Sequence, residues 1–583
     1  MADKTTSSKE HRRDSSTGSG RVYERSNSFA QINKMKILER NSGQIRKSIF
    51  MDYEYDLGDG AGADEVEEHL KSSDNQREGV QPSVLEEEGP ETEEKKSGEE
   101  KTVKESETEK ELKANALEKK KLSDYLVEMN WRYKPDGTFR AKFADLNFQP
   151  SISIFDRDAA YGSEFYGFYV AFWFIVAMFV LNILVKYYIE HGSIFKSRIF
   201  NIMMEDIWKV GLTDLLMYIS SYFPLILHKA VKAGIIRWRN TGRILESIYE
   251  CGFMWAFLIF SFNQNYPWIA KIFLMLHSVV FLMKIHSFAF YNGYMWDISN
   301  ELEASKGYLK KHDNLEPKVQ QGLMKSVNFC TFELETQAQK IKFPENLTYK
   351  NFFEYSMFPT LVYEVSYPRT ERIRWGYLFG KVAGIFGVIF IMVAVAQNNV
   401  YPIVMKCLEL RRTTTIITRL KEYPLILVEM IPPFLSLYML TFFLIWELIL
   451  NAIAELSRFA DREFYRAWWN STDWDHYSRD WNVPVHKFLL RHVYHSTISS
   501  FHVSKTTATL VTFLLSSLIH EVAMYVLFKK VRFYLLTLQM LQLPLIQLMR
   551  TKLFKSSPVL ANVFFWFGLV LGPTLLCTMY LVF

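Results

Sequence analysis

The sequence predicts an all-α, polytopic membrane protein with about nine transmembrane helices. Its first residues, up to about 160 of 583, are polar, whereas the remainder is rich in apolar residues. From Phe165 onward the chain contains apolar runs of the length that a helix needs to cross a hydrocarbon core, roughly 20 residues. Tyrosine and tryptophan gather at the ends of these runs, as in Tyr187–Tyr188 and Trp208, which is typical of membrane–water interfaces.

Residues 1–160 are predicted to form a disordered cytosolic region. They contain much Ser, Glu, Lys, Asp and Gly, few aromatic residues, and runs of like charge such as Glu86–Glu88. Such a segment cannot bury enough apolar surface to offset the entropy lost on ordering. Arg21–Phe50 is either a short amphipathic helix or a basic tail. No apolar stretch follows Met1, so we expect no cleavable signal peptide and a cytosolic N-terminus.

Residues 161–583 are predicted to form one membrane-embedded domain. The expected spans lie, in chain order, at 165–187, 207–228, 246–263, 267–284, 376–396, 424–455, 506–528, 532–549 and 558–583. The basic loop Lys229–Arg243 marks the cytosolic side after the second span, and an odd number of spans then places the C-terminus in the lumen. Two other basic loops, 397–423 and 529–532, fall on the lumenal side in this topology, which conflicts with the rule that basic loops are cytosolic. Either some segments are re-entrant, or the earlier loops carry the charge bias.

Two long stretches between spans are expected on the cytosolic side. The first, His286–Trp375, begins with a pattern that predicts an amphipathic element lying along the bilayer. The second, Ser457–Lys505, is dense in aromatic and basic residues. This density suits an interfacial surface, and equally a site for a ligand with phosphates and a flat ring. The four cysteines are widely spaced and the histidines show no metal-ligand spacing, so we expect no metal site.

His520 lies deep in the apolar run 506–528, with Glu521 beside it and Ser516 one helical turn earlier. Titratable groups at bilayer depth are costly, which predicts a functional site facing a protein interior or a wet cavity. His277, also inside a predicted span, is expected to serve packing or an interhelical hydrogen bond. The glycosylation sequons at Asn346 and Asn470 are interpreted as accidental, because both fall on the cytosolic side.

The sequence FYRAWWN at Phe464–Asn470, followed about fifty residues later by His520–Glu521, resembles the signature of the sterol and diacylglycerol branch of the membrane-bound O-acyltransferase superfamily. The stretches at 283–294 (MKIHSFAFYNGY), 358–375 (FPTLVYEVSYPRTERIRW) and 481–495 (WNVPVHKFLLRHVYH) are similar to fungal sterol O-acyltransferases. The resemblance extends from about residue 160 to Phe583. It implies the membrane-bound O-acyltransferase fold, with transfer of a fatty acyl group from acyl-CoA to a sterol.

The resemblance also implies residence in the endoplasmic reticulum membrane and a homodimer or homotetramer. The sterol esters are then expected to be made for storage, with ergosterol or a precursor as the acceptor. Acyl-CoA is then a co-substrate, no cofactor is expected, and the partners are acyl-CoA, sterol and membrane lipid rather than nucleic acid. Diacylglycerol O-acyltransferase is the main alternative. A lipid transporter fits less well, because the chain shows no repeated halves.

Each expected site residue has a chemical role. His520 accepts the sterol hydroxyl proton, because an imidazole ionises near pH 6.5, and Asn470 donates its amide to the thioester carbonyl. Three further substrate-binding residues are Tyr465 and Trp469, at the entrance for coenzyme A, and Lys487. Ser516 supports the histidine or the thioester; a Ser516–His520 nucleophile pair with an acyl-enzyme is the alternative.

Ala467 departs from the family pattern, which usually has an acidic residue there. We expect activity to tolerate the absence of this acidic side chain, as it would for a supporting or capping group, because His520 already supplies a base. We also expect that deleting residues 1 to about 150 leaves activity within a few-fold, since none of the candidate site residues lies there.

Overall fold

The computed structural model describes residues 132–134, 138–156, 166–192, 198–312, 317–338, 341–501 and 503–583. Within these residues the chain is helical, and its extended pairings are two isolated bridges, Tyr133 with Phe139 and Arg369 with Phe459. The predicted all-α class is therefore confirmed. Most of the region predicted to be disordered, including Arg21–Phe50, lies outside the described residues.

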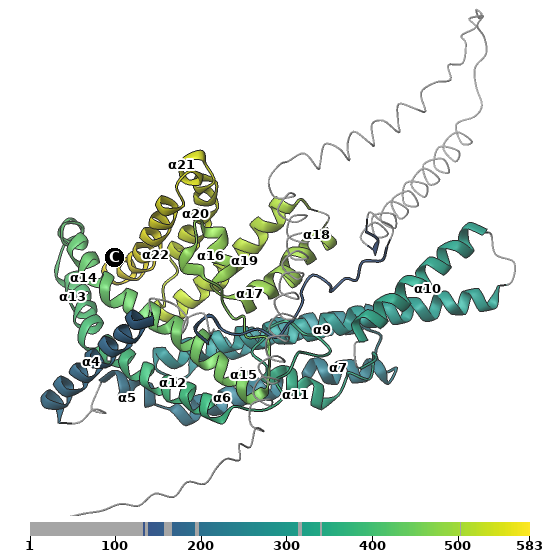
Figure 1. Ribbon diagram of the computed structural model, residues 1–583, viewed down its shortest axis with the longest axis horizontal. Helices are drawn as coiled ribbons and strands as arrows, with labels where there is room; N and C mark the ends of the chain where they lie inside the picture. Colours follow the sequence, from purple (N-terminus) through teal and green to yellow (C-terminus); the bar gives the residue numbers. More distant parts are fainter. Residues whose placement is uncertain are drawn as a thin grey trace, which may run out of the picture. The chain divides into compact units, whose positions relative to one another are not determined.

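A helix occupies each of the nine apolar runs (Figure 1). They are α4 (Tyr166–His191), α6 (Ile207–Ser220) with α7 (Phe223–Lys232), α8 (Arg243–Asn263), α9 (Trp268–Lys311), α12 (Trp375–Val395) with α13 (Tyr401–Thr413), α14 (Ile416–Phe442) with α15 (Leu450–Ser457), α19 (Lys505–Phe528), α20 (Tyr534–Met549) and α22 (Pro558–Val582). Seven helical segments of the described chain are long and apolar enough to cross a membrane. The multi-pass architecture is thus confirmed, whereas the count of about nine stays a prediction, since α20 has only 16 residues.

Shorter elements connect these helices. The α-helices among them are α5 (Arg198–Met204), α10 (Pro317–Ala338), α11 (Tyr349–Met357), α16 (Trp474–Asp480), α17 (Val483–Phe488), α18 (His495–Phe501) and α21 (Lys552–Lys555). Four π-helical segments are η3 (Trp238–Gly242), η4 (Ala396–Val400), η5 (Phe443–Ile449) and η7 (Leu489–Tyr494). Two 3₁₀ turns are η1 (Ile154–Asp156) and η6 (Trp468–Asn470).

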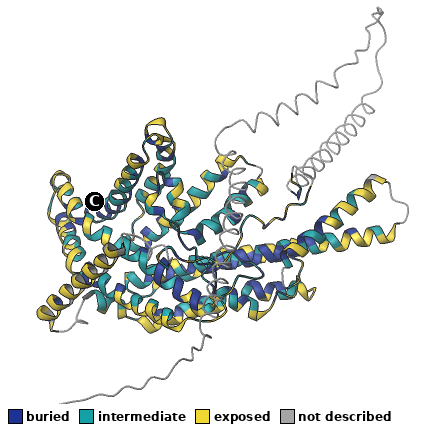
Figure 2. Cartoon of the chain, in the orientation of Figure 1, coloured by how far each residue is buried: buried dark blue, intermediate teal, exposed yellow. Residues whose placement is uncertain are grey.

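The predicted break between the span at 267–284 and a separate amphipathic element is wrong. α9 runs without interruption for 44 residues, about 66 Å at 1.5 Å per residue, which is twice the thickness of a hydrocarbon core. Beyond the expected span it packs against α10, where Ile298 meets Phe329 and Cys330 in a buried cluster. Many of its residues are buried, dark blue in Figure 2. The polar–apolar pattern therefore reflects packing on protein rather than on the bilayer surface.

The two basic loops that conflicted with the charge rule lie together. Cys407, Leu410 and Ile426 form a buried cluster with Val582 at the end of α22. The Arg532 guanidinium donates to the carbonyl oxygen of Phe583 at 2.7 Å. Both loops therefore lie on the same side of the protein, as the alternation of spans requires. Between α13 and α14 the chain reverses in a short turn.

Residues 138–156, here called the N-terminal strap, correct the expected domain boundary at residue 160. The Lys142 amide donates to the Glu333 carboxylate at 3.1 Å, and the Ser151 hydroxyl donates to Asp461 at 2.8 Å. Arg491, only 4% exposed, donates to Asp145 and to the Phe143 carbonyl oxygen. The strap is therefore part of the folded domain rather than of a disordered tail, because polar partners more than a hundred residues away fix it in place.

Candidate active site

α19 is packed on two faces. One face meets α8 and α9 through the residues of a shared cluster, Leu258, Met275, Ile519, Val522, Ala523 and Val526. The other meets α20 and α22 through Met524, Phe528, Leu535, Leu576 and Tyr580. The helix begins at Ser504, whose hydroxyl accepts from the Thr507 amide at 3.2 Å, an N-cap that satisfies one otherwise free donor. The backbone that carries His520 is therefore held by neighbouring helices on two sides.

His520 and Glu521 have different surroundings, so the two side chains do not share one buried site, and the wet cavity expected at His520 stays a prediction. Glu521 is buried and accepts from the Phe533 and Leu536 amides, at 2.8 and 3.2 Å, and from the Tyr580 hydroxyl at 3.0 Å. It thus caps the start of α20 and binds α22 to α19. His520 is exposed on the helix surface. Consecutive helical residues point about 100° apart, which separates the two side chains.

The His520 ring is fixed in one tautomer by its own helix. Its Nδ1 lies 2.7 Å from the main-chain carbonyl oxygen of Ser516. A carbonyl oxygen only accepts hydrogen bonds, so the proton of the neutral ring is on Nδ1 and the lone pair is on Nε2. Nε2 is thereby left as a proton acceptor at the exposed edge of the ring. Ser516 contributes to this arrangement through its backbone.

The exposed surface of α19 is divided into a polar and an apolar flank. Thr509, Ser516 and His520 fall within about 60° of one another around the helix. The exposed residues Leu514, Leu518 and Tyr525 lie on the other side, Leu518 being about 160° from His520. An apolar exposed flank suits lipid, whereas the flank of His520 carries these polar side chains beside the half-buried Phe513 and Leu527.

A second serine–histidine pair lies at hydrogen-bonding distance but is inaccessible. Ser287 Oγ is 2.8 Å from His492 Nε2 and also accepts from the Tyr363 amide at 2.8 Å. Ser287 is fully buried, and burial lowers the pKa of His492, which keeps the imidazole neutral. Because the Ser287 hydroxyl is fully buried, a substrate cannot reach it, and this pair joins α9 to η7 structurally.

The FYRAWWN segment forms a loop closed by η6. Trp468 is completely buried among aromatic rings, including Phe442, Trp481 and Trp566 at centroid distances of 5.2, 5.0 and 5.8 Å. Asn470, at the end of η6, is exposed. The loop therefore anchors one tryptophan in the core and presents the amide of Asn470 at its surface. Trp469 is half-buried, with its ring 6.1 Å from that of Phe155.

Ala467 occupies the N-cap position of η6. An acidic side chain at this position accepts a hydrogen bond from an amide of the first turn, which is the usual role of Asp at an N-cap. This position is consistent with a capping role for the acidic residue of the family pattern, and the expectation that its loss is tolerable stays a prediction.

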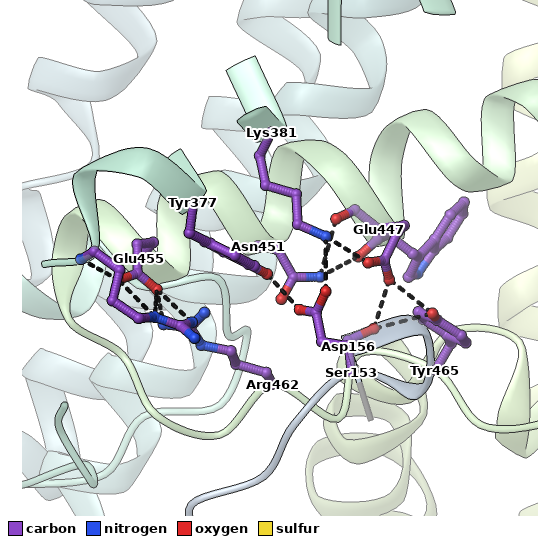
Figure 3. Close-up of polar contacts among 11 residues, drawn as sticks. Ser153, Asp156, Tyr377, Lys381, Glu447, Asn451, Glu455, Arg462 and Tyr465 are labelled. Atoms are coloured by element: carbon purple, nitrogen blue, oxygen red, sulfur yellow. Dashed lines mark hydrogen bonds and ion pairs between the residues drawn. The ribbon is translucent and has the colours of Figure 1, made fainter. Parts of the chain in front are cut away.

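Tyr465 lies inside the protein, in a polar network at the start of the loop (Figure 3). Its hydroxyl donates to Glu447 at 2.7 Å and is 3.0 Å from Ser153 Oγ of the strap. Glu447 also accepts from Lys381 at 2.6 Å, and Lys381 reaches Asp156 at 3.3 Å. Burial raises the pKa of Tyr465, so its hydroxyl stays protonated as a donor. The structure thus places Tyr465 where it fixes the loop to the strap.

Most of the lysine and arginine side chains of Ser457–Lys505 are engaged in ion pairs. These pairs are Arg462 with Glu455, Arg466 with Glu463 and Asp480, Arg479 with Asp475, Lys487 with Asp461, and Arg491 with Asp145 and Glu364. The Lys487 ammonium lies 3.0 Å from Asp461 and 4.7 Å from the centroid of the Phe148 ring. Much of the basic character of this segment therefore stabilises the fold. A direct role for Lys487 in binding substrate stays a prediction.

Other sequence interpretations can be placed. His277 Nδ1 lies 2.5 Å from Asp214 of α6, the interhelical hydrogen bond that was expected. Asn346 is buried, with its amide donating to Asn292 and Tyr363, so it is inaccessible to glycosylation. Among the described residues, no group of three His, Cys, Asp or Glu side chains is arranged to hold a metal. Sequence reasoning missed Asn562 and Trp566, whose side chains donate to the backbone beside Asn470.

Comparison with known proteins agrees with these features. A model of the membrane-bound O-acyltransferase family matches residues 312–582. Sterol O-acyltransferase 2 of Candida albicans is 45% identical over 486 residues, which cover 76% of this chain and 80% of the relative. Sterol O-acyltransferase 2 of Saccharomyces cerevisiae is 49% identical over 430 residues, 72% of this chain and 67% of the relative. The chain therefore belongs to the membrane-bound O-acyltransferase family, and it is similar to the sterol O-acyltransferases of yeasts along most of its length.

Proposed function

We propose that this protein transfers a fatty acyl group from acyl-CoA to the 3β-hydroxyl of a sterol, with His520 as the general base. The observation that supports the activity is identity of 45–49% to yeast sterol O-acyltransferases over about three quarters of the chain. Diacylglycerol O-acyltransferase is the second candidate. Diacylglycerol O-acyltransferase 1 of Dictyostelium discoideum is only 32% identical, over 41% of this chain, which favours a sterol acceptor.

In this proposal the reaction begins at Nε2 of His520. Nε2 takes the proton of the sterol hydroxyl while the hydroxyl oxygen attacks the thioester carbonyl carbon. The bond between that carbon and sulfur then breaks, and the coenzyme A thiolate receives the proton from the imidazolium. The histidine returns to its neutral form, with the products being one ester and one coenzyme A thiol. The hydrogen bond of Nδ1 to the Ser516 carbonyl supports the imidazolium, because the bond strengthens when the ring is charged.

Asn470 is proposed to stabilise the oxygen that becomes negative during this attack. Its amide is exposed at the end of η6, on a loop held by buried aromatic residues, and a primary amide donates hydrogen bonds without changing charge. Trp469 and Lys487 lie on the same aromatic–basic segment and are proposed to contact acyl-CoA. We further propose residence in the endoplasmic reticulum membrane, a homodimer or homotetramer, and ergosterol or a precursor as acceptor.

The proposed activity is tested with the full-length protein purified in detergent. Labelled oleoyl-CoA is supplied with ergosterol, cholesterol or diacylglycerol, and ester and free thiol are both measured. We expect equal amounts of sterol ester and coenzyme A. Ester formed chiefly from diacylglycerol would replace the sterol assignment with the second candidate, and a protein that forms no ester at all would contradict both.

Ser516→Ala is expected to retain activity within about threefold, because the contact with His520 comes from a backbone carbonyl that alanine keeps. The measurement is kcat for ester formation. An acyl-enzyme mechanism requires the serine hydroxyl itself and predicts a fall of several orders of magnitude, together with a covalent acyl adduct after brief mixing with acyl-CoA. A large loss with such an adduct would therefore establish the nucleophile mechanism instead.

Asn470→Ala is expected to lower kcat by about a hundredfold, the effect of losing one oxyanion donor. Ala467→Asp serves as the comparison within the same loop. It should leave kcat within a few-fold and raise thermal stability modestly, because an N-cap contributes about 0.5–2 kcal/mol. If Ala467→Asp raised kcat by orders of magnitude, or Asn470→Ala left it unchanged, the roles of these two positions would have been assigned wrongly.

A further inference from the structure

The loop that carries Asn470 is held by a helix far away in the sequence. Asn562 of α22 donates through Nδ2 to the carbonyl oxygens of Trp469 and Ser471, both at 2.9 Å. These two residues directly flank Asn470. Trp566, one turn further along α22, donates through Nε1 to the Trp469 carbonyl oxygen at 3.1 Å. We propose that Asn562 and Trp566 are positioning residues that set the orientation of Asn470; the inference rests on the proposed function of Asn470 as an oxyanion donor.

The loop is also held by its own backbone bonds, from the Asn470 amide to the Ala467 carbonyl oxygen and from the Ser471 amide to the Trp468 carbonyl oxygen, both 3.0 Å, and Asn562 and Trp566 add side-chain bonds to the same turn. η6 is a single 3₁₀ turn of three residues, and its N-cap Ala467 has no side chain that can bond the turn. Asn562 bonds the carbonyl oxygens of the residues before and after Asn470, so rotation of the Trp469–Asn470 peptide or of the Ser471–Thr472 peptide breaks one of its contacts. The Trp469 carbonyl accepts two donors, which occupies both of its lone pairs.

α22 is suited to this role because it is rigidly packed. Residues four apart lie on one helix face, which lets Asn562 and Trp566 act on the same loop. Between them, Phe565 is fully buried and lies 5.3 Å from the ring of Trp474. An added Cβ at Gly568 would lie 2.6 Å from the Trp474 ring, so α22 is also in close contact with α16, which follows the loop in the sequence.

A catalytic donor must be held within a few tenths of an ångström to favour the transition state, and the backbone beside Asn470 sets the position and direction of its Cα–Cβ bond, and hence where its amide can lie. Loss of the Asn562 bonds should therefore lower the rate of the chemical step more than substrate binding. Asn562→Leu, of similar size but without donors, is expected to reduce kcat by about tenfold and to change KM for acyl-CoA by less than threefold. Trp566→Phe keeps most of the ring packing and should reduce kcat by about threefold.

Thr574→Val is the matched control. Thr574 lies on the same helix, is buried, and donates only into its own helix, to the Val570 carbonyl oxygen at 2.9 Å. The kcat of the Thr574→Val variant should stay within twofold of that of the unmodified protein. All variants are compared as full-length protein with equal folded fractions, measured by size-exclusion chromatography and thermal unfolding.

A double-mutant cycle separates positioning from plain structural support. If Asn562 acts through Asn470, then Asn562→Leu has no further effect on kcat once Asn470→Ala is present, and the same holds for Trp566→Phe. Losses that multiply would show that Asn562 supports the fold independently and would overturn the inference. The inference is also overturned if Asn562→Leu and Trp566→Phe both have a normal kcat while Asn470→Ala is slow. That outcome leaves the proposed function standing. A normal kcat in Asn470→Ala overturns both.

If Asn562→Leu does not fold, Trp566→Phe still decides the question. It removes one donor only, and its coupling to Asn470→Ala is measured in the same way. A threefold loss that disappears in the Asn470→Ala background supports the inference, and a loss that persists there contradicts it.

Discussion

Replacing His520 with alanine or glutamine is expected to abolish detectable ester formation, with a fall in kcat of roughly three orders of magnitude, the middle of the range for a general base. The physical reason is the fixed tautomer: Nδ1 donates to the Ser516 carbonyl oxygen, which leaves Nε2 to accept the sterol proton. Glutamine has no nitrogen that can take up this proton. The measurement is ester released from labelled acyl-CoA by purified protein, with acyl-CoA binding measured in parallel.

His277→Ala is the control for this result. His277 is bonded to Asp214 between α9 and α6, so its loss should lower thermal stability more than turnover. Binding of acyl-CoA should be unchanged in the His520 variants, because the residue is exposed and its neighbour Glu521 makes the interhelical contacts. If the His520 variants form ester at the rate of the unmodified protein, the assignment of the base is wrong. If the unmodified protein only moves lipid and forms no ester, a carrier would be favoured.

Removing the N-terminal strap is expected to prevent folding, whereas removing only residues 1–131 should leave activity within a few-fold. The strap supplies Asp145 and the Phe143 carbonyl to Arg491, and Ser153 and Asp156 to the network around Glu447. Breaking a buried ion pair by removing one partner costs about 3–5 kcal/mol, and the strap forms more than one such contact. We therefore no longer expect deletion to about residue 150 to be harmless, and we place the limit of a tolerated deletion at residue 131.

The two deletions are compared in membranes and after extraction, by the fraction of protein that elutes as a single species and by its specific activity. Asp145→Asn is a point variant that tests the same contact without shortening the chain. It should lower the temperature of inactivation while retaining activity at low temperature, because Glu364 still pairs with Arg491 at 2.6 Å. A stable and active protein lacking residues 1–156 would show that the strap contributes little.

The sequence by itself determined the membrane architecture and the catalytic candidate. Each apolar run became a helix, because a chain within a bilayer must satisfy its backbone hydrogen bonds internally. It also singled out His520, since a titratable side chain in an apolar run needs a compensating function. The length of α9 was misjudged because a helical pattern covered by α10 has the same periodicity as one covered by lipid.

Only the tertiary structure decided which neighbours in sequence share a function. Glu521 follows His520 but caps α20, since adjacent helical positions face different surroundings. Tyr465 and Lys487 acquired carboxylate partners, Glu447 and Asp461. Asn562 reaches the loop of Asn470 from 91 to 93 residues away. No local pattern encodes such pairs, because their distances depend on how every intervening helix packs. The sequence therefore supplied the candidate reacting groups, and packing decided which contacts each of them makes.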